Sequence, residues 1–266
     1  GPAALADVPA GSALLEINVR KTTAADFSEL IALLQRPPGE TSRLLIKSAA
    51  APRPMELGLV HRVVDRRSVA ESKLLDGSAT GYVRLATFGS GCGREMEAAL
   101  DELEDGGMKS LILDLRQNGG GDLHETVKIL GFFLPPGTVA VTTRGRDGES
   151  AEPMRTPDRQ RRKRDYPMVV LIDRMSASAS ELTAGALQDL KRATVVGELS
   201  YGKGSVQGII PMGGGTALRL TTATYHTPSG NTPHRKGITP DVAVVINDKD
   251  RANFVKRCRI NALGPD

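Results

Sequence analysis

The chain has 266 residues, of which 39% are hydrophobic and 25% are charged, and its formal net charge is +4. Such a length can bury one large core or two modest ones. No apolar run approaches the roughly 20 residues that a membrane-spanning helix needs, so we expect no transmembrane segment. Only 3% of the residues are aromatic. The basic stretch at 155–164 therefore predicts a solvated loop and not a nucleic-acid site. Cys92 and Cys258 show neither a metal-binding spacing nor a disulfide framework.

Residues 1–64 predict a small α+β unit. Its expected elements are a strand at 13–18, a helix capped by Thr23 that ends before Pro37, and strands at 42–46 and 55–64 joined by a proline-containing turn at 50–54. The segment LLEINVRKTTAADFSELIALLQRPPGETSRLLIK resembles the later two-thirds of a PDZ domain. No glycine-containing carboxylate loop of the PDZ kind precedes Ala13, so the resemblance implies a partial PDZ-like domain over residues 1–64.

Residues 65–266 predict an α/β domain. A polar linker is expected at 65–76, and apolar runs then alternate with helical patterns. Strands are expected at 82–85, 111–115, 139–143, 168–172 and 193–197. Such alternation is typical of βαβ units with a largely parallel sheet. A hairpin around the glycines at 213–215, a last strand at 242–246 and a short basic helix after 248 complete the prediction.

Three serines lie where the buried strand at 168–172 turns into a helix. At such a turn the first helical N–H groups have no partner within the helix. A hydroxyl there can act as a nucleophile, and the free N–H groups can hold an oxyanion. The pattern Ser178-x-x-Glu181 is also a capping box. The residues alone therefore do not choose between a cap and a nucleophile, or among Ser176, Ser178 and Ser180.

Lys203 stands between two glycines after the strand at 193–197. The run from Gly197 to Ser205 almost matches a phosphate-binding P-loop, but Gly204 stands where serine or threonine must hold magnesium. A P-loop also opens a helix, whereas this run leads into the predicted hairpin. We expect instead that Lys203 is buried, because a desolvated lysine favours its neutral amine and can take a proton from serine.

Four sequence blocks occur in a fixed order: LILDLRQNGGG, SASASELTAGALQD, VVGELSYGKGSVQ and TPSGNTPHRKGITPDV. Together they resemble the carboxyl-terminal processing (tail-specific) peptidase family, and the similarity extends from about residue 74 to residue 246. The resemblance implies a Clp protease/crotonase-like βαβ catalytic domain over residues 65–266, preceded by the partial PDZ-like unit. It implies a serine endopeptidase that cleaves polypeptides near their C-terminus through an acyl-enzyme.

The family's roles fall on five residues of this sequence: the nucleophile Ser178, the general base Lys203, the lysine-orienting Gln207, and the oxyanion-hole donors Ala179 and Gly120. Structural support is the role we expect for Glu181 and Ser200. Met175 departs from the family, which usually has glycine there. The amino-terminal helical segment common in the family has no counterpart in this sequence.

The resemblance also implies partners and a compartment. The expected substrates are polypeptides with free C-termini, and no metal or organic cofactor is implied. Family members are exported, to a bacterial periplasm or cell envelope or to a thylakoid lumen, and a homo-oligomer remains open.

Three alternatives are compatible with parts of the sequence. The first is a Ser-His-Asp triad, for which the candidates are His124, His226, His234, Asp114 and Asp241, although no motif supports it. The second is a catalytically silent family member that acts as a binding scaffold. The third is a crotonase-type acyl-CoA enzyme, against which the Ser-Lys pair and the PDZ-like segment argue.

Overall fold

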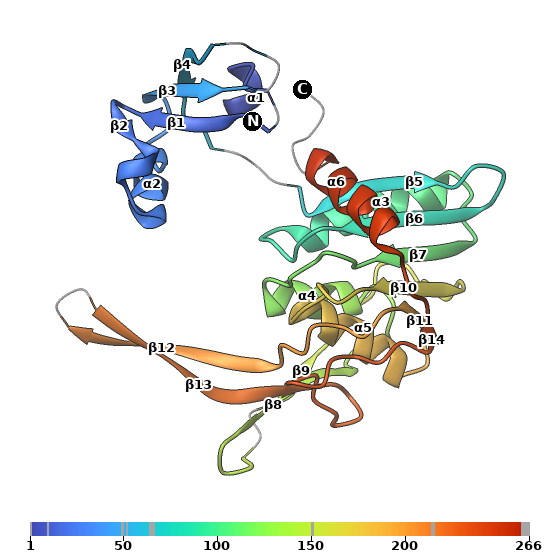
Figure 1. Ribbon diagram of the computed structural model, residues 1–266. Helices are drawn as coiled ribbons and strands as arrows, with labels where there is room; N and C mark the ends of the chain where they lie inside the picture. Colours follow the sequence, from blue (N-terminus) through green and yellow to red (C-terminus); the bar gives the residue numbers. More distant parts are fainter. Residues whose placement is uncertain are drawn as a thin grey trace. The chain divides into compact units, whose positions relative to one another are not determined.

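The computed structural model describes residues 2–9, 11–48, 51, 53–63, 67–149, 152–213 and 216–261 (Figure 1). The chain separates into two compact units, one within residues 1–66 and one over residues 67–262. Among the described residues, no helix combines the length and the apolar character that crossing a bilayer requires.

The first unit is a four-stranded antiparallel sheet in the order β2-β1-β3-β4. Its elements are α1 (Pro2–Leu5), β1 (Ala13–Ile17), β2 (Arg20–Lys21), η1 (Thr22–Ala24), α2 (Phe27–Leu34), β3 (Thr41–Lys47) and β4 (Met55–Val60). The buried core is small and consists of Ile17, Leu44, Ile46 and Leu59. The predicted cap at Thr23 is wrong, because Asp26 caps α2 by accepting a hydrogen bond from the Glu29 N–H. The predicted turn at 50–54 lies partly outside the described residues.

The second unit is built on a six-stranded sheet in the order β14-β11-β10-β7-β6-β5. Its strands are β5 (Val69–Leu74), β6 (Thr80–Leu85), β7 (Ser110–Asp114), β10 (Met168–Ile172), β11 (Thr194–Gly197) and β14 (Val242–Ala243). All neighbouring strands run parallel except β5, which pairs antiparallel with β6. The helices that follow the strands are α3 (Cys92–Asp105), α4 (Leu123–Leu130) and α5 (Ala179–Asp189). The mixed α/β fold and its βαβ alternation are therefore as predicted.

Two predicted segments differ from the structure at the edges of this sheet. Residues 69–74 form the edge strand β5 and not a linker. Their pattern is hard to recognise because an edge strand can expose charged side chains, and here Glu71 and Lys73 form an ion pair. The last predicted strand is shortened to Val242–Ala243, since only these two residues pair with β11.

A second sheet of the same unit is antiparallel, in the order β12-β13-β8-β9. Its strands are β8 (Val139–Gly145), β9 (Met154–Arg155), β12 (Ser205–Gly213) and β13 (Thr216–His226). The predicted hairpin is thus present, and β12 and β13 form a long ribbon that projects from the unit (Figure 1). The predicted basic helix is α6 (Asp248–Asn261), whose Phe254 ring lies 4.0 Å from the guanidinium of Arg116.

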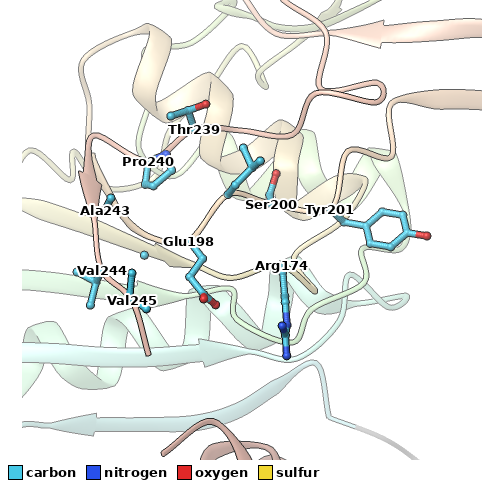
Figure 2. Close-up of a pocket in the computed structure, with 11 residues that line it drawn as sticks. Arg174, Glu198, Ser200, Tyr201, Thr239, Pro240, Ala243, Val244 and Val245 are labelled. Carbon is cyan, nitrogen blue, oxygen red and sulfur yellow. The ribbon is translucent and has the colours of Figure 1, made fainter. Parts of the chain in front are cut away.

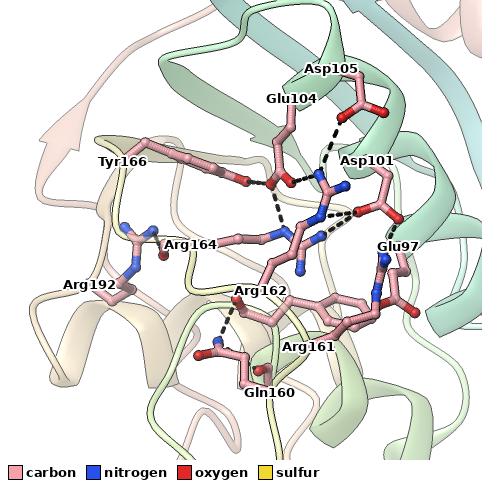
Figure 3. A network of polar contacts seen from close by, with 12 residues as sticks. Glu97, Asp101, Glu104, Asp105, Gln160, Arg161, Arg162, Arg164, Tyr166 and Arg192 are labelled. Carbon is pink, nitrogen blue, oxygen red and sulfur yellow. Dashed lines mark hydrogen bonds and ion pairs between the residues drawn. The ribbon is translucent and has the colours of Figure 1, made fainter.

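The basic stretch is held against α3 by ion pairs (Figure 3). Arg164, whose side chain is only 1% exposed, contacts Asp101 and Glu104 at 2.9 and 2.7 Å. Arg161 pairs with Glu97 and Asp101 on the same helix. The prediction of a solvated loop is therefore wrong for Arg164, because the acidic face of α3 neutralises the charges that the sequence leaves unpaired.

Candidate active site

The three serines lie on the turn that joins β10 to α5. Asp173, at the start of this turn, accepts hydrogen bonds from the Gln117 and Met175 N–H groups, both at 3.0 Å. Ser178 is the N-cap of α5, with φ +57° and ψ −114°. A residue other than glycine seldom adopts this backbone conformation. It costs of order 1–3 kcal/mol and persists only where the surrounding structure holds it. The turn is therefore a strained strand-to-helix elbow.

The structure separates the three serines, which the sequence could not. The hydroxyl of Ser176 is buried and donates to the Leu115 carbonyl at 2.8 Å. The hydroxyl of Ser180 is buried and donates to the Asn118 carbonyl at 2.8 Å. Ser178 is only partly buried and takes part in the capping box with Glu181. Unlike the other two hydroxyls, that of Ser178 donates to no main-chain carbonyl among the described residues, so its proton is available.

The glycine loop after β7 packs directly against the elbow. Gly120 has φ +98°, and a methyl group added there would lie 2.9 Å from Ser178 Cβ and 3.0 Å from the Ala179 nitrogen. Only glycine permits this approach. Ala179 opens α5, so its N–H has no partner within the helix. The N–H of Gly120 instead donates to Asn118 Oδ1 at 2.9 Å. The structure thus brings both predicted oxyanion donors beside Ser178, but it holds one of them in another bond.

Glu181 connects the elbow to the lysine segment. Its carboxylate is fully buried and accepts four hydrogen bonds, from the N–H groups of Ser178, Gly202 and Lys203 and from the Ser200 hydroxyl, at 2.8, 2.7, 2.8 and 2.5 Å. The Ser178 and Lys203 N–H groups share one oxygen, Oε2. The two nitrogens therefore lie no further apart than twice 2.8 Å.

The side chains of Lys203 and Gln207 are exposed. The predicted burial of Lys203 is therefore wrong. The neighbouring glycines bury the main chain and not the amine: Gly204 is buried, and a methyl group there would lie 2.6 Å from the His234 nitrogen. Gln207 follows an irregularity in the pairing of β12 with β13. No hydrogen bond joins the Ser178 and Lys203 side chains in the described part of the chain, so their pairing stays a prediction.

Three of the five triad candidates, His226, Asp241 and Asp114, have other side-chain partners, and Nδ1 of His234 is buried without a hydrogen-bond partner among the described residues. His226 lies on β13, where its ring bonds the Gly230 carbonyl at 2.9 Å and the Thr224 hydroxyl at 3.0 Å. The carboxylate of Asp241 accepts from the Val195 N–H at 2.8 Å. Asp114 is fully buried and bonds Arg116 and the Tyr82 hydroxyl. Burial and the nearby Asp114 raise the pKa of Tyr82. Within the described ranges no histidine ring bonds an aspartate, so these residues do not assemble a triad.

Asn118 is a site residue that the sequence reasoning missed. Its side chain bonds the Leu85 carbonyl and the Gly120 N–H, at 2.8 and 2.9 Å. Its own carbonyl accepts from the Ala177 N–H at 3.0 Å. Asn118 therefore fixes the glycine loop and the elbow to each other. The available signal was a buried strand that leads into asparagine and three glycines, where a short amide side chain can order a loop that glycine leaves loose.

A strained serine elbow with an open helical N–H beside it is the arrangement that enzymes with a serine nucleophile use. The chain belongs to peptidase family S41, whose model matches residues 79–244. The match includes the glycine loop, the serine elbow and the lysine segment.

Similar proteins carry names from the same family. The chain is 38% identical over 248 residues to a carboxy-terminal-processing protease of Bartonella bacilliformis, covering 91% of this chain and 56% of that protein. It is 35% identical over 254 residues to a carboxyl-terminal-processing protease of Synechocystis sp., with the same two coverages of 91% and 56%. The chain thus spans just over half the length of these relatives. A solved photosystem II D1 C-terminal processing protease matches all of this chain and 70% of its own, with 30% identity and a TM-score of 0.55.

Proposed function

We propose that this chain is a serine endopeptidase that cleaves polypeptides near their C-terminus through an acyl-enzyme on Ser178, with Lys203 as the general base. The observation that carries the proposal is the shared carboxylate oxygen of Glu181, which accepts from the N–H groups of both residues. Of the three serines on the elbow, Ser178 has the hydroxyl proton that is not given to a main-chain carbonyl. The names of the relatives supply the preference for C-terminal regions.

In the proposed reaction the neutral Lys203 amine takes the Ser178 hydroxyl proton as Oγ attacks the scissile carbonyl carbon. The resulting oxyanion accepts from the Ala179 N–H and from the Gly120 N–H, which must first leave Asn118 Oδ1. The intermediate then collapses, and the Lys203 ammonium returns the proton to the departing amine. Water, with Lys203 again as base, hydrolyses the ester and frees Ser178. Lys203 is anchored at its main chain and exposed at its amine, so a rotamer change can bring the amine to the hydroxyl.

Gln207 is proposed to hold the amine in that position, since its carbonyl oxygen can accept from lysine without adding a charge. The wider assignment follows the same family. We assign residues 65–266 to a Clp protease/crotonase-like catalytic domain and residues 1–64 to a partial PDZ-like domain. Polypeptides with free C-termini are the proposed substrates, and the proposed reaction uses no metal or organic cofactor. The relatives are bacterial and chloroplast proteins, and we place this one outside the cytoplasm, in a cell envelope or a thylakoid lumen.

The test is cleavage of a peptide with an unstructured C-terminal tail, with products located by mass spectrometry. Ser178→Ala should abolish cleavage and labelling by a fluorophosphonate probe. Lys203→Arg keeps a cation that cannot act as a base, so the rate should fall by about a hundredfold to ten-thousandfold. Lys109→Arg, an exposed lysine at the start of β7, is the matched control.

A folded Lys203→Arg protein that cleaves at the parental rate would refute the assignment of the base. A parent chain that neither cleaves the peptide nor reacts with the probe would favour the catalytically silent scaffold.

A further inference from the structure

Helix α6 presents one face to the rest of the second unit. Among its described residues, the side chains that are partly or fully buried are Arg251, Phe254, Val255 and Cys258, and the others are exposed. Their spacing of three and four residues places them on one side of the helix. Only Cys258 is fully buried. The helix therefore covers little apolar surface, and its contacts need another explanation than a shared hydrophobic core.

Arg251 holds the start of the lysine segment. Its two terminal nitrogens donate to the two carboxylate oxygens of Glu198, each at 2.7 Å. Glu198 is the first residue after β11, where it lines a pocket of about 630 Å³ together with Ser200 and Tyr201 (Figure 2). The side chains of Arg251 and Glu198 are only 14% and 19% exposed. A two-point contact of this kind fixes the direction of the carboxylate as well as its distance, so it orders the segment that leads to Lys203.

The same guanidinium group lies close enough to the serine elbow to interact with its charge. The hydrogen bonds to Glu198, and then the charges of Asp173 and Asp248, raise the pKa of Arg251. Arg174 is a further cation near Glu198. Asp173 is the first residue after β10, and its carboxylate accepts from one N–H group of the loop after β7 and from one N–H group of the elbow. Arg251 therefore stands beside the carboxylate that joins these two segments.

Phe254 contacts the start of the glycine loop. The centre of its ring lies 4.0 Å from the guanidinium carbon of Arg116 and 5.4 Å from that of Arg257 on its own helix. Arg116 is the second residue after β7, and its side chain bonds both carboxylate oxygens of Asp114. A cation over an aromatic face is attracted to it. The ring thus covers the residue from which the loop runs to Gly120.

The contacts of α6 fall at the ends of three neighbouring strands, β11, β10 and β7. These strands lead into the lysine segment, the serine elbow and the glycine loop, which are the three parts of the candidate site. Because a helix is a stiff element with all its main-chain bonds internal, contacts from one helix keep the segments at fixed distances from one another. A helix that only covered the sheet would need no charged pair at a strand end.

We propose that Arg251 and Phe254 are positioning residues of the candidate active site. Through Glu198 and Arg116 they fix the lysine segment and the glycine loop to one helix, so that both stay in place beside Ser178. The proposal rests on the function proposed above and adds how the geometry of that site is held. A displacement of about 1 Å can lower a catalytic rate about a hundredfold. Loosening either segment should therefore lower kcat and leave KM nearly unchanged.

The kinetic test uses the full chain and the tail peptide. Arg251→Gln should lower kcat, and the rate at which the fluorophosphonate probe labels Ser178, by about tenfold or more. Glu198→Gln combined with Arg251→Gln should be no slower than Arg251→Gln alone, because both remove the same contact. Phe254→Leu should lower kcat severalfold, whereas Phe254→Tyr keeps the ring and should retain the parental kcat. Lys256→Gln removes a cation from the exposed side of the same helix and is the matched control.

Hydrogen exchange followed by mass spectrometry measures each segment separately and needs no catalysis. Arg251→Gln should speed exchange mainly over residues 198–203, and Phe254→Leu mainly over residues 116–121. Lys256→Gln should change neither. A general loss of stability would instead speed exchange over both segments in both variants, and urea unfolding measures that loss independently.

A folded Arg251→Gln protein with the parental kcat overturns the proposal, as does exchange over residues 198–203 equal to that of the Lys256→Gln control. A fall in kcat that matches the unfolded fraction also overturns it. If Arg251→Gln does not fold, the comparison of Phe254→Leu with Phe254→Tyr decides in the same way. A parent chain that neither cleaves nor reacts with the probe refutes the peptidase proposal, and the exchange measurement then decides by itself whether α6 holds the two segments.

Discussion

Replacing Glu181 by glutamine tests whether one buried carboxylate holds the candidate site together. Each hydrogen bond to a charged group contributes about 1.5–3 kcal/mol, and a buried donor left without a partner costs about 1–3 kcal/mol. The glutamine amide can accept at only one of its two ends. If its nitrogen faced Ser178 and Lys203, two N–H donors would lose their acceptor. If it faces the other way, the Ser200 hydroxyl can rotate to accept and only the Gly202 N–H is left unpaired.

The second orientation should therefore prevail, and Glu181→Gln should lower the free energy of unfolding by about 2–4 kcal/mol, with one donor lost and three bonds no longer charge-assisted. Peptide cleavage should persist, because Ser178 and Lys203 keep their shared acceptor. Glu181→Ala should abolish it. Urea unfolding followed by circular dichroism supplies the free energies. Glu102→Gln, an exposed carboxylate on α3, is the control and should stay within about 0.5 kcal/mol of the parent. A Glu181→Gln protein as stable as that control would refute the reasoning.

Three further predictions concern other parts of the second unit. Gly120→Ala should cost roughly 3 kcal/mol or more, because φ is +98° and the methyl group would lie 2.7 Å from a carbonyl oxygen, whereas Gly119→Ala, with nothing within 4 Å, should be nearly neutral in the same urea assay. Arg164→Ala should cost about 3 kcal/mol by removing the buried guanidinium from Asp101 and Glu104, which then keep only the more exposed Arg161 and Arg162 as cations, while loss of the exposed Arg161 should change the midpoint little. Burial raises the pKa of Cys92 to about 12. Since alkylation needs the thiolate, iodoacetamide should label this residue at about pH 8 only after unfolding, and rapid labelling of the folded protein would contradict this.

The strands that the sequence predicts best are the buried ones, which appear as short runs of mostly apolar residues. The run at 111–115 predicts β7 within one residue, and the run at 168–172 coincides with β10. Both lie inside the parallel sheet, where both faces are covered, and both runs are apolar except for Asp114. The strand β5 was not predicted. An edge strand needs fewer apolar residues, and the charged residues of β5 are typical of a linker.

In the candidate site too, the sequence predicts the residues but not their contacts. The four ordered blocks were enough to nominate Ser178 and Lys203, but no local pattern indicates which hydroxyl proton a carbonyl far along the chain will take. The Leu115 and Asn118 carbonyls accept the hydroxyl protons of Ser176 and Ser180, across sequence separations of 61 and 62 residues. The exposure of Lys203 has a similar cause. Glycines on both sides predict a closely packed main chain, and they carry no information about the direction of the side chain between them.

The ribbon of β12 and β13 has a consequence for how this fold opens. Its outer part is exposed on both strands, and residues such as Met212 and Leu218 remain 64% and 45% accessible. A two-stranded ribbon without a covering layer is marginally stable, so strand pairs in its outer part, such as Ile210 with Leu218, separate before those near its root. There β13 is held by its pairing with β8 over Ala223 to His226, and the other strand is preceded by the Lys203 N–H that Glu181 binds. Glu181 therefore keeps the main chain of Lys203 beside the elbow even when the two strands of the ribbon separate.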